Sequence, residues 1–219
     1  MEPFLQISTW VHASLGLVCL VSGVLALTAK KAKGRHTNAG RVFLVSLTLT
    51  FFAILINIVV QKNVFMLCIG WLAVYAGVMG WRALLRAKDR LAFAATAFDY
   101  TLVGTTALLS VGLIVLGIRV LAASNTAMGL VCLGFGLLGA LMVRSFWQRQ
   151  KNPPTKPQWL ALHIHMMAGA FSAALTAFFA IQLSGHIGGF EWVVWVAPSL
   201  IMSRYATNEC KRRGLEKAS

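Results

Sequence analysis

The chain has 219 residues, of which 58% are hydrophobic and only 12% are charged, and its mean hydropathy is +0.73. A soluble domain is rarely so apolar, so this composition excludes an ordinary soluble enzyme and is typical of a polytopic membrane protein. The first apolar run follows MEPFLQ, which lacks both a basic segment and a small-residue cleavage site. We therefore expect a retained first helix and one bundle over residues 1–219, with no second soluble domain.

The formal net charge is +14. Apart from Lys62 and Arg119, the Lys and Arg residues fall into four clusters, at 30–41, 82–90, 144–156 and 204–217. These clusters occupy alternate loops, which predicts that those loops are cytoplasmic and that the amino terminus is outside. We interpret the charge as a topology signal and a contact for anionic lipid headgroups, with Lys33, Arg35 and Arg41 as lipid-binding residues, rather than as a nucleic-acid footprint.

Seven apolar runs are long enough to cross a bilayer, the last only barely. We expect an all-α bundle of seven transmembrane helices in a bacterial inner membrane, with the carboxyl terminus in the cytoplasm. The predicted helices cover residues 8–29, 42–60, 64–85, 93–122, 126–147, 159–183 and 192–206. No lysine lies within the last of these, which excludes a retinal Schiff base there. A homo-oligomer stays an open alternative to a monomer.

The sixth run carries His163 and His165 near its start. Histidine is costly in hydrocarbon, so a histidine inside a span is a candidate for a functional site with a partner elsewhere. The two residues are about 200° apart on a helix, so one faces the bundle and the other turns away, and spacing alone does not choose between them. A stripe of small residues predicts that another helix approaches this one closely, at Gly169, Ala173 and Ala177.

Asp99 is the only acidic residue within a predicted span. We expect it to lie with His36 and His163 at the cytoplasmic ends of the second, fourth and sixth helices. Imidazole with carboxylate suits zinc, iron or copper, whereas two imidazoles alone suit axial ligation of a haem b. Asp99 would orient a ligand or relay a proton. The alternative is a structural pairing with Arg82, Arg86 or a histidine.

Two more histidines lie outside that group. His12 is one turn inside the outer end of the first helix, where it is a cofactor-ligand candidate or simply hydrogen-bonds a neighbouring helix. His186 falls in an outer glycine-rich loop. His36 itself lies in the first basic loop, and the alternative for it is a solvated or lipid-facing side chain.

Several spaced patterns carry a resemblance: HxxxG at 12–16, KGxHxxxGRxF at 33–43, WLxxHIxxMxGA at 159–170 and AAxTAF at 173–178. Together they resemble an uncharacterised family of bacterial multi-pass membrane proteins, known as a domain of unknown function, over most of the chain. The resemblance implies that His12, His36 and His163 are shared site histidines, with Arg41 and Met167 beside them. It names no chemistry for that site.

Two other similarities are weaker. Transmembrane diheme cytochromes b also place histidines near helix ends at both faces, but here the outer partner of His12 would have to be His186. Seven-helix membrane metallohydrolases of the ceramidase type need a late His-xxx-His pair, whereas this chain has His163-x-His165.

Our leading hypothesis is a redox protein that binds haem b or a transition metal through His36 and His163, with His12 at the outer end. The alternatives are a small-solute or ion transporter with a path lined by His12, Asn57, Asp99 and His163, a membrane metallohydrolase, and a structural scaffold. The sequence leaves open whether the protein is an enzyme.

Overall fold

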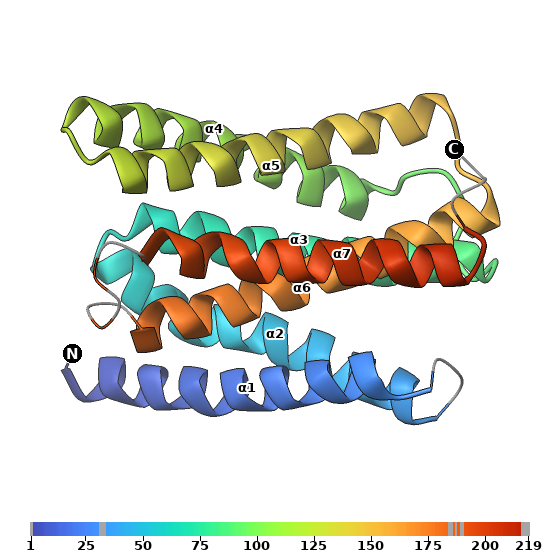
Figure 1. The fold of residues 1–219 in the computed structure, drawn as a ribbon, viewed down its shortest axis with the longest axis horizontal. Coiled ribbons are helices and arrows are strands. Elements are labelled where there is room, and N and C mark those ends of the chain that lie inside the picture. The colour runs from blue at the N-terminus through green and yellow to red at the C-terminus, as the bar shows by residue number, and fades with distance from the viewer. Residues whose placement is uncertain (1, 31–33, 184–185, 187, 189–190, 216–219) are drawn as a thin grey trace.

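Figure 1 shows the computed structural model, which describes residues 2–30, 34–183, 186, 188 and 191–215. Within these ranges the chain forms seven helices: α1 (Glu2–Thr28), α2 (Arg35–Val60), α3 (Val64–Ala87), α4 (Ala97–Ala122), α5 (Thr126–Lys151), α6 (Lys156–Leu183) and α7 (Glu191–Arg212). Successive helices run antiparallel, so their connections alternate between the two ends of the bundle (Figure 1). The predicted all-helical class is confirmed.

Six of these helices, α1 to α6, are long and apolar enough to cross a membrane. Large apolar side chains are exposed along them, for example Leu17, at 63% exposure, and Leu108, at 72%. Water would make such a surface unfavourable, whereas lipid tails cover it at no cost. The fold is therefore that of a multi-pass membrane protein.

The helices are arranged around α3 and α6, which pack on each other. The α1–α2 pair lies along one side of this centre and the α4–α5 pair along the other, while α7 packs on α6 (Figure 1). Close packing of α4 on α5 depends on glycine, because a Cβ at Gly136 would lie 3.1 Å from both the Ser110 carbonyl oxygen and the Ile114 nitrogen. A larger residue there would separate the two helices.

The small stripe predicted on α6 is only partly a packing surface. Gly169 is exposed, and a Cβ added to it would meet no atom within 4 Å. The close approach of α3 is instead at Ala170, whose Cβ lies 3.8 Å from a Cβ built at Gly77. As expected, α6 is a central helix. However, α3 contacts the face of α6 that carries Ala170, not the face that carries Gly169.

Most Lys and Arg residues lie at one end of the bundle, which we call the basic end. It contains the connections α1–α2, α3–α4 and α5–α6 and the end of α7 (Figure 1), and so all four predicted clusters as far as the structure describes them. Lys62 and Arg119 lie at the opposite end, at the α2–α3 turn and in the last turn of α4.

Two helix boundaries differ from the prediction in ways that affect the candidate site. Helix α2 begins at Arg35, not at residue 42, so His36 lies in its first turn rather than in a loop. Hydropathy identifies only the apolar part of a helix. The helical backbone hydrogen bonds continue past that part into polar sequence. Helix α4 begins at Ala97, not at residue 93, because Thr96 caps it.

Candidate functional site

His163 is half-buried on α6 and faces the bundle. Its Nδ1 lies 2.9 Å from the main-chain oxygen of Gly80 on α3. His165, two residues later, is exposed on the other side of the helix. The structure thus answers the question that spacing left open, because only the His163 side chain is placed inside the bundle.

His36 makes the same kind of contact at the same end of the molecule. From the first turn of α2 its Nδ1 lies 2.8 Å from the main-chain oxygen of Ala26 on α1. His36, Lys88 and Arg213 all lie close enough to interact electrostatically with the His163 ring. The basic end therefore brings together the two predicted inner histidines within a positively charged surrounding.

His12 repeats the pattern near the opposite end. Its Nδ1 lies 3.0 Å from the main-chain oxygen of Thr50, so it links α1 to α2. Asn57, one of the residues of the predicted polar path, links the same pair of helices, since its amide donates to Leu5 O at 3.1 Å and to Thr9 Oγ1 at 2.9 Å. The interhelical hydrogen bond that was the alternative role expected for His12 is present.

The three histidines share a protonation pattern. A main-chain carbonyl can only accept a hydrogen bond, so Nδ1 must be the protonated nitrogen in each ring. In the neutral imidazole the lone pair then lies on Nε2. Metal-ligating histidines commonly show this arrangement, with Nδ1–H held by a carbonyl and Nε2 directed to the metal. The same bonds also cross-link helices.

Asp99 is fully buried and belongs to a different cluster. Its carboxylate accepts from Arg82 Nε at 2.5 Å and from Arg82 Nη2 at 2.7 Å, both from α3. Arg86 Nη2, one turn further on, donates at 2.8 Å. Thr96 completes a capping box, its main-chain N–H and hydroxyl donating to Asp99 Oδ2 at 2.8 and 3.0 Å. Asp99 therefore ties the end of α3 to the start of α4.

The three-residue metal set His36, Asp99 and His163 is not assembled. Asp99 is engaged by two guanidinium groups, as the structural alternative for it anticipated. Within the ranges that the structure describes, no three His, Cys, Asp or Glu side chains come together as a group that could hold a metal ion. What remains of the predicted inner site is the pair of imidazoles.

The other predicted residues that the structure describes in this region are exposed. Arg35, which directly precedes His36, and Arg41, both expected at lipid headgroups, are exposed at the basic end, and Lys33 lies outside the described residues. His186 is exposed in the turn between α6 and α7.

Sequence reasoning missed how completely the charges would be buried. Arg82 is 8% exposed and Arg86 2%, and the Arg86 guanidinium lies over the Trp159 ring, 5.1 Å from its centroid. Two signals were available. Arg82 and Arg86 are four residues apart and so share a helix face, and Thr96-x-x-Asp99 matches a capping box in which aspartate replaces the usual glutamate.

Comparisons of the chain with protein-family models, with curated proteins and with solved structures found no match. The family resemblance drawn from the histidine patterns therefore stays a prediction, and the case for a function depends on the geometry of the basic end.

Proposed function

We propose that this protein is a seven-span membrane protein of the bacterial inner membrane that binds haem b through His36 and His163 and works in electron transfer. The observation that carries the proposal is the hydrogen bond from Nδ1 of each ring to a main-chain oxygen, because it leaves the lone pair of each neutral imidazole on Nε2, across the ring from that oxygen.

Haem is favoured over a bare metal ion for a chemical reason. Two imidazoles are a complete axial set for a b-type haem, whereas a transition-metal site built from side chains usually needs three or four ligands. The carboxylate that would have been the third ligand, Asp99, is bonded to two arginines. Lys88 and Arg213, in the electrostatic surroundings of His163, would offset the negative charge of haem propionates.

The test is an absorbance spectrum of the detergent-purified protein, oxidised and then reduced with dithionite, together with elemental analysis of the same sample. We expect a Soret band that shifts on reduction and is lost in His36→Ala and in His163→Ala. His165→Ala is the matched control, because it removes an exposed imidazole from the same helix turn and should leave the spectrum unchanged.

Two other outcomes would contradict haem binding. Stoichiometric zinc, iron or copper without a Soret band would favour the metal alternative, including a metallohydrolase. A protein free of haem and metal from haem-supplied cells would favour transport, for which a flux lowered by Asp99→Asn is the measurement, or a scaffold.

The topology is part of the proposal. The positive-inside rule supports a cytoplasmic basic end, and α7, with 22 residues, is about 33 Å long, enough to cross the hydrocarbon core. A fluorescent-protein fusion after Ser219 should fluoresce if α7 crosses and the carboxyl terminus is cytoplasmic. A dark fusion, with an active alkaline phosphatase at the same place, would instead indicate six spans.

A further inference from the structure

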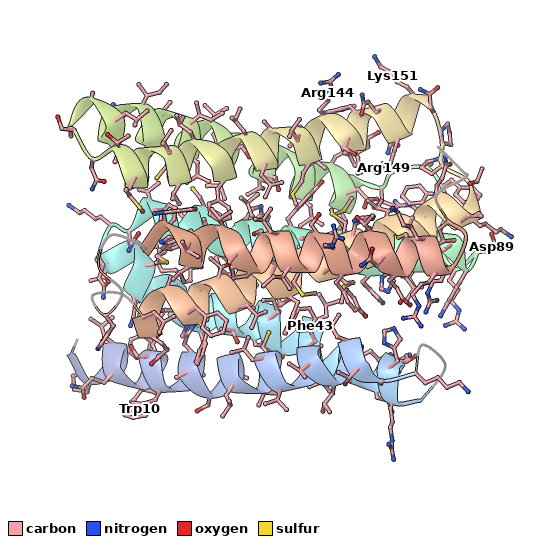
Figure 2. All side chains as sticks on the ribbon, in the orientation of Figure 1. Trp10, Phe43, Asp89, Arg144, Arg149 and Lys151 are labelled. Atoms are coloured by element: carbon pink, nitrogen blue, oxygen red, sulfur yellow. The ribbon has the colours of Figure 1, made fainter. Side chains whose placement is uncertain are left out.

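The cluster around Asp99 contains more positive charge than its own carboxylate can neutralise. Arg82 and Arg86 are both buried beside Asp99. A third arginine, Arg149, approaches from the inner side of α5, whereas Arg144 and Lys151 project from the outer side of the same helix (Figure 2). Arg149 lies close enough to interact electrostatically with Arg86. We call these three arginines and Asp99 the arginine cluster. Three guanidinium groups against one carboxylate leave it with an excess of two positive charges.

No other described carboxylate at the basic end offsets that excess. Asp89 pairs with Lys156 at 2.6 Å, and both side chains are exposed. Glu209 pairs with Arg213 at 2.7 Å on α7. Uncompensated charge in a buried position is expensive, so an excess of this kind calls for a counter-ion.

Two buried polar groups beside the cluster also have no hydrogen-bond partner within the described residues: the hydroxyl of Tyr75 and the indole N–H of Trp159. Tyr75 is 0% exposed and Trp159 3%. Tyr75 interacts electrostatically with Arg149 and with Asp99, and the Trp159 ring lies under the Arg86 guanidinium. A buried polar group without a partner costs about 1–3 kcal/mol, so such groups usually have a water or ligand partner.

Arg149 has unused donors as well. Within the described residues its one hydrogen bond joins Nη1 to Ser145 Oγ, at 2.5 Å. A guanidinium has five N–H groups in a planar fork, which matches the oxygens of phosphate or carboxylate. Unused hydrogen-bond donors and excess positive charge from α3, α5 and α6 thus occur in one region, formed by the arginine cluster with Tyr75 and Trp159.

We propose that the arginine cluster, with Tyr75 and Trp159, is a binding site for a phosphate-type oxyanion. The hydroxyl, the indole N–H and the Arg149 guanidinium donate to its oxygens, and its negative charge balances the excess. The arginine cluster and Trp159 lie near the basic ends of α3, α4, α5 and α6, the depth at which the phosphates of a phospholipid lie if the helices span a membrane. Tyr75 lies in the middle of α3 and would contact the oxyanion from the deeper side. The oxyanion is therefore either a phospholipid headgroup or free inorganic phosphate.

The proposal is tested on the full-length protein after delipidation in detergent. Inorganic phosphate is titrated calorimetrically, and retention of phosphatidylglycerol is compared with retention of phosphatidylcholine by native mass spectrometry. The test variants are Arg149→Gln and Tyr75→Phe. The matched control is Arg144→Gln, which removes the same charge from the outer side of the same helix.

We expect Arg149→Gln and Tyr75→Phe each to weaken binding at least tenfold, while Arg144→Gln changes it less than twofold. Binding of inorganic phosphate identifies a site open to free anions, and retention of phosphatidylglycerol alone identifies a lipid site; either outcome supports the proposal. The proposal is overturned if neither probe binds, or if Arg144→Gln weakens binding as much as Arg149→Gln does.

The melting temperature of Tyr75→Phe gives an independent readout that does not require the variant to bind. If the hydroxyl has no ligand, removing an unpaired buried group should leave the protein as stable or more stable. If it holds an oxyanion, adding phosphate or phosphatidylglycerol should raise the melting temperature of the wild type more than that of Tyr75→Phe. Equal shifts would contradict the proposal.

Discussion

Two polar regions lie at the basic end of this protein, and they are constructed in opposite ways. In the arginine cluster, charged side chains bond to one another. The fully buried carboxylate of Asp99 forms ion pairs with Arg82 and Arg86. In the histidine region, which consists of His36 and His163, each imidazole bonds to the main chain of another helix. The first region cannot lose Asp99 without leaving two buried guanidinium groups unpaired. The second can lose the His163 ring and keep a satisfied backbone, because the Gly80 carbonyl lies inside α3 and retains its helical bond. We therefore expect the ion pairs of Asp99 to determine stability and the histidines to determine haem binding.

The largest expected effect tests the charged side of this comparison. Asp99→Asn removes the carboxylate and leaves Arg82 and Arg86 buried without a counter-charge, which should cost about 3–5 kcal/mol. Unfolding in mixed detergent–SDS micelles measures this loss. Asp89→Asn is the matched control, because its pair with Lys156 is exposed and should be worth at most about 1 kcal/mol. Equal losses in the two variants would break the comparison.

The next effect concerns Gly80, whose main-chain oxygen bonds to His163. A Cβ added at Gly80 would lie 3.0 Å from Met166 Cβ and 3.2 Å from Met167 Cγ, so Gly80→Ala should push α6 away from α3. We expect a loss of about 1–2 kcal/mol and a weakened bond between His163 and the Gly80 carbonyl. Gly104→Ala on α4 meets no atom within 4 Å and should be neutral or slightly stabilising. Any Soret band of the wild type should broaden or shift in Gly80→Ala alone.

A smaller loss is expected at the cap of α4. Thr96→Ala removes the hydroxyl that accepts from Asp99 N, at 3.4 Å, and that bonds to Arg82 Nη2, at 2.8 Å. Loss of an N-cap costs about 1 kcal/mol. Thr96→Ser keeps the hydroxyl and should recover most of the stability in the same micelle titration. A serine variant as unstable as the alanine variant would show that the methyl group, not the cap, matters.

The smallest effect on stability is expected on the histidine side. His163→Phe keeps a ring of similar size and loses the bond to Gly80, so its cost should stay near 1 kcal/mol. The same variant should lose all bound haem, as measured by the Soret absorbance. A loss of stability as large as that of Asp99→Asn would contradict the division of roles between the two regions.

The helical architecture was readable from the sequence because it follows from local properties. Apolar runs of about twenty residues and alternate basic loops depend on no distant contact, and helices do form at all seven positions. The starts of α1 and α2 lie further out than predicted, because residues 2–7 and 35–41 continue the two helices beyond their uninterrupted apolar runs.

The candidate site was less predictable, because it depends on which helix faces which. Spacing could not choose between His163 and His165, since two faces of one helix can both be buried in a bundle of this size. Asp99 was grouped with histidines from its depth alone, although a capping box and two arginines one turn apart gave a nearer set of partners. The orphan hydroxyl of Tyr75 has no sequence signal, because a tyrosine in an apolar run is identical whether or not its oxygen is bonded.

The closeness in sequence of Arg82, Arg86 and Asp99 has a consequence for biogenesis. Their helices α3 and α4 are joined by a short connection, so the carboxylate follows the guanidinium groups during synthesis by fewer than twenty residues. If the bundle is inserted into a membrane, α3 and α4 would enter as one hairpin in which Asp99 already pairs with both arginines of α3, and these pairs would not depend on the carboxyl-terminal half of the chain. The contact between His163 and Gly80 spans 83 residues and must form later, after α6 has been made.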